Sequence, residues 1–269
     1  MTITSTVPQQ ATVFTHAEAA LLAAAVNARF AELVAGLTPA DWSRPTDCSS
    51  WDVRALSCHV LGMMEANVSI PRFVHDLRRG KSVAAARADL PTMTDGMTAV
   101  QVTERADLVP PVITARLTAL APRAARARTS LPGLLRRVPM SIEVAPGVHE
   151  PWKLGYLFDT IMTRDTWMHR IDLSRAVGRP VVLTPEHDGR IVADVVAEWA
   201  RRHGRPFRLH LEGPAGGDFA GAGTSTTSPD STGGEAPHVE EHSLDAVEFC
   251  RILSGRATGT GLLTQLVPF

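Results

Sequence analysis

The stretch Arg164-Asp165-Thr166-Trp167-Met168-His169-Arg170-Ile171-Asp172 decides both the fold and the chemistry of the chain. An apolar stripe at helical spacing from Leu154 onward runs directly into Asp165, His169 and Asp172. Burying such groups is costly unless they are paired or bind a metal. Because residues four apart lie one turn apart on the same helix face, Asp165 and His169 can bind one divalent cation together, with a third ligand from elsewhere.

His59 is the candidate for the third ligand. It follows Leu56 by three residues and precedes Met63 by four, so it lies on the buried face of a predicted helix. Two histidines and one carboxylate leave coordination positions open on zinc or a similar ion, which is typical of catalytic rather than structural sites. The alternative is an ordinary pair of satisfied core histidines, because Asp-x-x-x-His is a short pattern.

Composition limits the classes of protein to consider. The chain has 269 residues, enough for one large domain or two modest ones, and its net charge of −1 predicts no attraction to nucleic acid or an anionic membrane. It shows neither a signal-peptide pattern nor an apolar run of transmembrane length. The three cysteines are widely spaced, which predicts reduced thiols in a cytoplasmic protein.

Residues 1–180 predict an antiparallel four-helix bundle. The four helices are expected from about His16 to Thr38, Ser50 to Phe73, Thr94 to Arg128 and Lys153 to Val177. Pro110-Pro111 must kink or split the third helix. The segment Ser141–Glu150 predicts a turn or small hairpin, and Gly178 ends the fourth helix.

The composition changes after Pro180, and residues 181–269 predict a small α+β domain. A helix is expected over Pro185–Arg202 and a strand over Phe207–Leu211, where apolar residues alternate. Gly213–Pro237 is rich in Gly, Ser and Thr and predicts a flexible loop. A last helix is expected over Leu244–Ser254.

Two segments, Trp42 to His59 and Arg164 to Ala176, resemble the mycothiol-dependent maleylpyruvate isomerase family. That family belongs to the DinB-like superfamily of metal-binding four-helix bundles. The ending from Ser243 to Arg256, with Val267-Pro268-Phe269, is similar to the family's small C-terminal domain, which has a sterol-carrier-like α+β fold. The resemblance therefore implies an α+β protein with an N-terminal DinB-like bundle.

The resemblance also implies the zinc ligands. The family has a histidine on the second helix, matched by His59, and a Glu-x-x-x-His pattern on the last bundle helix, whose histidine is matched by His169. Asp165 stands where the family usually has glutamate. Because aspartate is one methylene shorter, the metal is expected to lie closer to the helix or to be held more loosely.

Several charged residues near these motifs have two possible roles. Asp172 either supports a metal ligand or pairs with Arg170 or Arg175. Arg256 matches the family's C-terminal arginine segment, which implies a catalytic contact with a substrate or thiol carboxylate; the alternative is a surface arginine that caps the last helix. Arg164 and Arg170 point away from the ligands, so both are expected at the surface or at a domain contact.

The chemistry that the resemblance implies is thiol activation by Zn2+ or another divalent metal, with mycothiol as the thiol cosubstrate. The metal lowers the pKa of the thiol, and the thiolate attacks an electrophilic small molecule. In an isomerase the thiol adds to a cis double bond, the bond rotates and the thiol leaves; in an S-transferase it stays attached. The chain is expected to be a monomer or a weak homodimer.

Two other functions remain open from the sequence. A hydrolase on the same bundle would use metal-bound water as its nucleophile. A non-catalytic protein would hold an apolar ligand or a partner, with a structural metal or none. Trp51, Trp152, Trp167 and Cys58 are expected to be packing residues rather than parts of a binding site.

Overall fold

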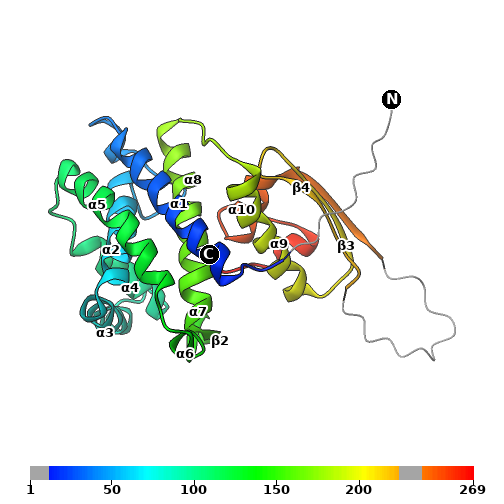
Figure 1. Ribbon diagram of the computed structural model, residues 1–269, viewed down its shortest axis with the longest axis horizontal. Coiled ribbons are helices and arrows are strands. Elements are labelled where there is room, and N and C mark those ends of the chain that lie inside the picture. The colour runs from blue at the N-terminus through cyan, green and yellow to red at the C-terminus, as the bar shows by residue number, and fades with distance from the viewer. Residues whose placement is uncertain (1–11, 224–237) are drawn as a thin grey trace. The chain divides into compact units, whose positions relative to one another are not determined.

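The structure, a computed structural model, describes residues 12–223 and 238–269 (Figure 1). The chain divides into two compact units. One comprises Thr15–Val181 together with Phe269, and the other comprises Val182–Pro268 with the described residues that precede Thr15. The first unit is mainly helical and the second combines helices with a small sheet, so the predicted α+β fold with a helical N-terminal region is confirmed.

Four helices of the first unit form the predicted bundle. They are α1 (His16–Ala35), α2 (Val53–Val68), α5 (Pro110–Thr129) and α8 (Met162–Val177). Buried side chains from all four meet in one core, among them Phe30, Leu61, Leu117 and Leu173. Since each fully buried side chain of this size contributes about 1.5–3 kcal/mol, this shared core is what holds the bundle together.

The second predicted helix is in fact two helices. α2 ends at Val68, earlier than predicted, because Ser69 adopts an extended conformation with φ −143° and ψ 104°. The Ser69 hydroxyl caps α3 (Ile70–Ala86), and Pro71 suits its first turn because proline needs no amide partner there. α3 therefore continues as a regular helix past Arg78 and ends at Ala86.

The third predicted helix is divided as well. α4 (Met93–Thr103) begins at a capping box, in which the side chains of Thr92 and Asp95 accept hydrogen bonds from each other's backbone amides. α5 begins at Pro110, so the proline pair splits the segment, as the sequence predicted. The result is an extra helix, α4, that the four-helix prediction did not contain.

α4 packs very closely against α3 and α2. A Cβ added to Gly96 of α4 would lie 2.1 Å from the carbonyl oxygen of Gly80 in α3. A Cβ added to Gly62 of α2 would lie 2.7 Å from Cβ of Gln101 in α4. Glycine at these crossings therefore sets how near the Gln101 side chain comes to α2.

A π-helical turn precedes the helix that carries the metal-binding motif. α7 (Leu154–Tyr156), η2 (Leu157–Ile161) and α8 follow one another without a break, and η2 is the π-helical turn. Such a turn accommodates an extra residue, so the apolar stripe predicted from Leu154 does not keep its phase into α8. α8 ends at Gly178, whose positive φ of 69° closes the helix as predicted.

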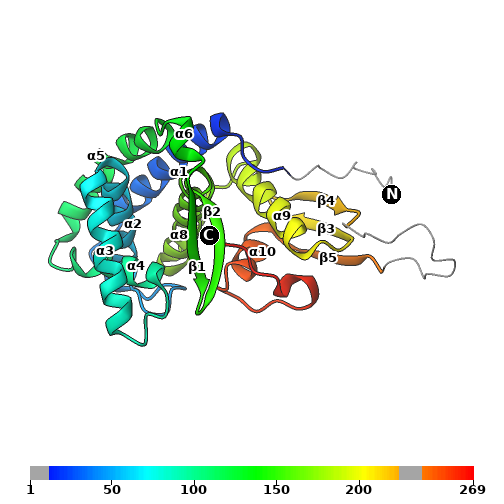
Figure 2. The same ribbon diagram turned by 90° about the horizontal axis from the view of Figure 1, so that it is seen from below.

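The predicted hairpin is present between α5 and α8. β1 (Pro139–Ala145) and β2 (Val148–Lys153) pair antiparallel, and Gly147, with φ 73°, makes the turn (Figure 2). The fourth helix consequently begins after Lys153, close to the predicted start.

The second unit is built on a three-stranded sheet with the order β4-β3-β5. Its strands are β3 (Phe207–Glu212), β4 (Gly217–Gly221) and β5 (Glu240–Asp245), with β3 antiparallel to β4 and parallel to β5. α9 (Arg190–His203) and α10 (Ala246–Leu253) cover one face of this sheet (Figure 2). The apolar side chains of β3 alternate toward that face.

The predicted loop over Gly213–Pro237 is wrong in its first part, because Gly217–Gly221 forms β4. The glycine-rich sequence of this edge strand has no strand pattern, so the strand was not predicted. The remainder, residues 224–237, lies outside the described residues. β5 was also missed, since its sequence Glu-Glu-His-Ser-Leu-Asp is almost wholly polar and shows no apolar alternation.

None of the helices in the described part of the chain has the length and apolar character that a membrane span requires.

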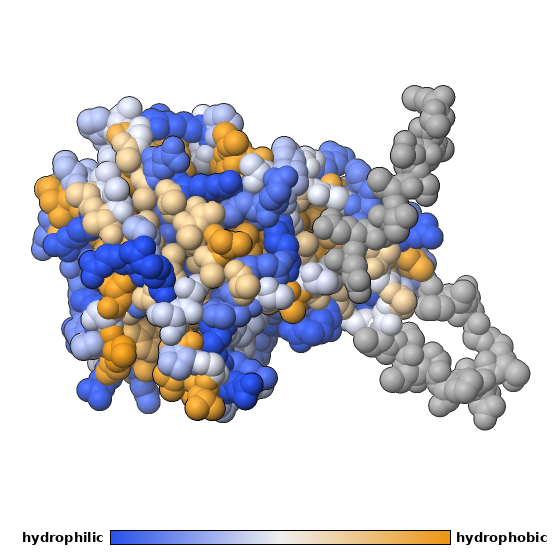
Figure 3. Space-filling model, in the orientation of Figure 1, coloured by the Kyte–Doolittle hydropathy of each residue, from blue (hydrophilic) through white to orange (hydrophobic). Residues whose placement is uncertain are grey.

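The face of the bundle seen in Figure 3 mixes hydrophilic and hydrophobic residues. A groove between α1 and α5 is lined mainly by small side chains, including Ala24, Ala28, Ala31 and Ala121. Small residues at this crossing allow the two helices to lie close together.

We predict that Gly96→Ala lowers the free energy of unfolding by about 1–3 kcal/mol, because the added methyl group meets the Gly80 backbone. Gly133→Ala is the matched control, since its Cβ would meet nothing within 4 Å. Its effect should stay within about 0.5 kcal/mol. Urea denaturation of both variants measures the difference, and equal effects would contradict the close α3–α4 crossing.

Candidate metal centre

Three side chains converge between α2 and α8: His59 from α2, and Asp165 and His169 from α8. Asp165 Oδ2 lies 3.5 Å from His59 Nε2, and Asp165 Oδ1 lies 3.4 Å from His169 Nε2. The two imidazole rings are 5.0 Å apart between centroids. The structure thus brings together all three residues that the sequence predicted as metal ligands.

The donor atoms of this cluster fit a divalent metal. His59 Nε2 and Asp165 Oδ2 are buried and have no hydrogen-bond partner among the described residues. A buried polar atom left unpaired costs about 1–3 kcal/mol. Ligand atoms bound tetrahedrally at about 2.0–2.1 Å from zinc lie about 3.3 Å from one another, close to the separations seen here.

The Nδ1 nitrogen of each imidazole faces a hydrogen-bond acceptor on another residue. His59 Nδ1 lies 2.8 Å from Gln101 Oε1, and His169 Nδ1 lies 3.0 Å from Asp172 Oδ2. Because an amide oxygen and a carboxylate only accept hydrogen bonds, Nδ1 of each histidine is the donor in these contacts. That leaves both Nε2 atoms facing Asp165, so Nε2 is the nitrogen that each histidine would offer to a metal after losing its proton.

The electrostatics of the cluster also favour a cation. Burial acts to raise the pKa of Asp165, but the His169 and His59 imidazoles outweigh it and hold this pKa well below its usual range. Burial acts to lower the pKa of His169, but the Asp165 carboxylate and hydrogen bonds to Asp165 and Asp172 raise it well above its usual value. Positive charge is therefore stabilised next to Asp165.

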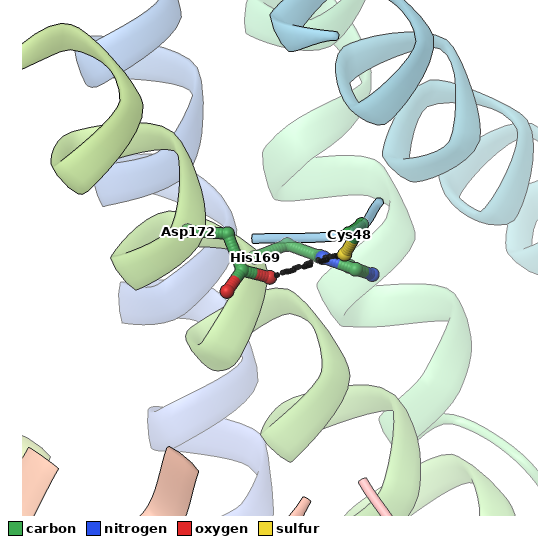
Figure 4. Close-up of side chains that lie close together, drawn as sticks. All are labelled: Cys48, His169 and Asp172. Atoms are coloured by element: carbon green, nitrogen blue, oxygen red, sulfur yellow. Dashed lines mark hydrogen bonds and ion pairs between the residues drawn. The ribbon is translucent and has the colours of Figure 1, made fainter. Parts of the chain in front are cut away.

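Cys48 and Asp172 lie beside His169 (Figure 4). Both face its Nδ1, whereas Asp165 faces its Nε2. The Cys48 thiol is 3.5 Å from Asp172 Oδ2 and 3.9 Å from His169 Nδ1. Asp172 thus contacts a candidate ligand, as one of the two roles that the sequence left open for it requires. The sequence predicted no role for Cys48 in the site. The only sequence signal for such a role is its position shortly before Trp51 and the N-cap of α2.

Trp51 forms one wall of the cluster. Its ring centroid is 5.0 Å from that of His59 and 5.8 Å from that of His169. The expectation that Trp51 is an ordinary packing residue therefore misses its position over the candidate ligands. Trp167 and Cys58, by contrast, are buried core residues, as expected.

Gln101 is the residue of the site that the sequence did not reveal. It lies on α4, which the bundle prediction did not separate from α5, and it is 42 residues from His59 in the chain. The Gln101 backbone carbonyl accepts a hydrogen bond of 2.8 Å from Arg105 Nη1, and Arg105 is also paired with Glu65. A buried polar network thus holds the amide that orients His59.

Two other groups of possible ligands fit a metal less well. Cys48, His169 and Asp172 would share His169, but through Nδ1, which already faces Asp172.

The third group joins His75, Asp76 and Glu104. Arg72 already pairs with both acids, and the exposed His75 lies 2.8 Å from Glu104 Oε1. In the cluster of His59, Asp165 and His169, by contrast, both histidine Nε2 atoms converge on one carboxylate.

The structure corrects part of the prediction for two arginines. Arg164 and Arg170 are buried, because nearly every position of α8 is enclosed, so the expected surface position is wrong; the other expected position, a domain contact, stays a prediction. The Arg164 guanidinium lies 6.0 Å from the centroid of the Phe269 ring. Arg256 is half-buried in the second unit, where its amide donates to the Arg251 carbonyl at 2.8 Å, so its proposed catalytic contact stays a prediction.

Comparisons with known proteins find a matching family model and structures with a similar fold. A family model described as the mycothiol maleylpyruvate isomerase N-terminal domain matches residues 23–174, which include all three candidate ligands. Crystal structures of mycothiol-dependent maleylpyruvate isomerase and of a histidine-to-alanine mutant of it share the fold. Each covers 91% of both chains, with a TM-score of 0.55 and 13% identity. A comparison with curated proteins finds no significant match.

We predict that the purified protein binds about one zinc per chain and that His59→Ala and His169→Ala abolish this binding without loss of helical content. Gln101→Leu should weaken zinc affinity about 10- to 100-fold, because His59 loses the acceptor that orients it. Gln265→Leu, in the second unit, is the matched control and should bind zinc like the parent. Elemental analysis and competition with a chelator provide the measurements; a well-folded parent that takes up no zinc would contradict the site.

Proposed function

Since the chain belongs to the mycothiol maleylpyruvate isomerase family, we propose that it is a metal-dependent isomerase that uses mycothiol as its thiol. The observation that carries this proposal is the pair of Nε2 atoms, from His59 and His169, that face the Asp165 carboxylate in a buried site. Both Nδ1 atoms are already held by acceptors, so the cluster is oriented before any metal arrives.

His59, Asp165 and His169 would hold the metal. When bound, a divalent metal supplies Lewis-acid chemistry that lowers the pKa of a thiol, so that a thiolate is present at neutral pH. Three protein ligands suit this task because they leave room for a reactant, whereas four would close the site. Asp165, one-fifth exposed, is the ligand nearest to solvent, and both histidines are nearly fully buried.

The remaining residues keep this cluster in place and shield it from water. Gln101 and Asp172 accept hydrogen bonds from the two Nδ1 atoms, so that Nε2 of each histidine is the nitrogen that would bind the metal. The Trp51 ring covers the two imidazoles on one side. A desolvated site strengthens electrostatic interactions, which favours the charged form of the thiol reactant next to a cation.

The proposed reaction balances without any further reactant. The thiol adds its sulfur and a proton across a cis carbon–carbon double bond that is conjugated to a carbonyl group. The former double bond is now single and rotates. Elimination then releases the thiol and leaves the trans isomer, so that no thiol is consumed.

We further propose that the reactants are small molecules and that the protein works in a reducing compartment such as the cytoplasm. Its three cysteines, Cys48, Cys58 and Cys250, form no disulfide bond. A thiol cosubstrate also needs a compartment that keeps it reduced.

We predict that isomerisation of maleylpyruvate requires both mycothiol and bound metal. Removing the metal with a chelator, or His169→Ala, should lower the rate on the order of 100-fold or more, since even loss of a residue that supports a ligand costs 10- to 100-fold. His149→Ala, on the exposed hairpin, is the matched control and should keep the parent rate. Ultraviolet absorbance follows the reaction, and a thiol titration follows the cosubstrate.

Two outcomes would overturn the proposal. Turnover without any added thiol would indicate a hydrolase or another thiol-independent enzyme. Consumption of one thiol per substrate would indicate an S-transferase.

A further inference from the structure

Arg128, in the last turn of α5, is a buried cation with an incomplete set of hydrogen bonds. Only 1% of its surface is exposed. Its Nε donates to the Phe158 carbonyl at 2.8 Å, and its Nη2 donates to the Thr163 hydroxyl at 2.6 Å. Both acceptors belong to the segment that leads into Asp165, so the guanidinium is fixed next to the helix that carries two candidate metal ligands.

Local backbone structure explains why these acceptors are available. Phe158 lies in the π-helical turn η2, and such a turn alters which amide each carbonyl faces. The Thr163 hydroxyl donates to the Asp159 carbonyl at 2.7 Å, so its proton is already used and its oxygen accepts from Arg128. Two fixed acceptors therefore hold the guanidinium plane in one orientation.

The third nitrogen, Nη1, is buried and has no hydrogen-bond partner among the described residues. Burial lowers the pKa of Arg128 to about 9, and the Asp165 carboxylate counteracts this effect. The group is therefore charged at neutral pH and is influenced electrostatically by a candidate metal ligand. Burying a charged group with an unused hydrogen-bond donor costs free energy unless an anion accepts a hydrogen bond from that donor.

We propose that Arg128 Nη1 binds a carboxylate of the substrate, so that Arg128 is a further substrate-binding residue beside the candidate metal ligands. The inference rests on the proposed function, because it assigns a residue to the substrate of that same site. Guanidinium groups pair more strongly with carboxylates than with neutral acceptors, and their rigid planar donors fix the orientation of the partner. Arg128 would thereby orient the double bond relative to the metal ligands.

The test measures binding without turnover. Isothermal titration calorimetry of the zinc-loaded protein with maleate, in the absence of thiol, compares the parent with Arg128→Met. Maleate, a cis-unsaturated dicarboxylate, should bind about 10- to 100-fold more weakly to the variant, as expected for loss of a charged hydrogen bond. Metal content, measured on the same samples, should be unchanged.

Thr163→Val is the matched control. It removes one of the hydrogen bonds that position Arg128 but leaves Nη1 in place, so maleate affinity should stay within about threefold of the parent. If Arg128→Met does not fold, Arg128→Lys replaces it. Lysine keeps the charge but lacks the planar donors, so maleate should bind about tenfold more weakly.

Three results would overturn the inference: no maleate binding by the parent, parent-like binding by Arg128→Met or Arg128→Lys, or an equal loss in Thr163→Val. The last result would give Arg128 a purely structural role. Because the titration needs neither thiol nor turnover, its outcome is separate from the isomerase assay. An inactive parent whose maleate affinity still depends on Arg128 would reject the proposed reaction alone.

Discussion

The structure depends on one electrostatic constraint: two imidazole nitrogens and a carboxylate face one another in the interior of a helix bundle. His59 Nε2 and Asp165 Oδ2 have no other partner within the described chain, and burial makes such atoms costly. We propose that a divalent cation bound there satisfies them and His169 together. The raised pKa of His169 and the lowered pKa of Asp165 express the same preference for positive charge in this place.

Much of the surrounding fold serves to hold these three groups. The close crossings at Gly62 and Gly96 bring α4 near enough to α2 for Gln101 to reach His59. Asp172, on the same helix as His169, performs the corresponding task for the second imidazole. The π-helical turn before α8 frees a carbonyl that anchors Arg128, so a backbone irregularity and a buried charge next to the site are linked.

The sequence predicted the parts of this site that follow from local periodicity. Asp165 and His169 are four residues apart on one helix, and His59 lies on a buried face, so all three could be found without coordinates. Gln101 and Arg128 could not, because their contacts join residues 42 and 35 positions apart and leave no periodic signal. The helix break at Ser69 and the polar strand β5 were not predicted either. Hydrophobic spacing gives no signal for them, because the break depends on helix capping and the strand depends on pairing with β3.

Long-range nitrogen NMR of the imidazole side chains, with and without zinc, tests the metal centre most directly. Zinc should shift Nε2 of His59 and of His169, while both Nδ1 atoms stay protonated through Gln101 and Asp172. The other histidines should be unaffected. A zinc-dependent shift of Nδ1 of His169 would instead place the metal against Cys48 and Asp172, and no shift at His59 would contradict the centre described for this chain.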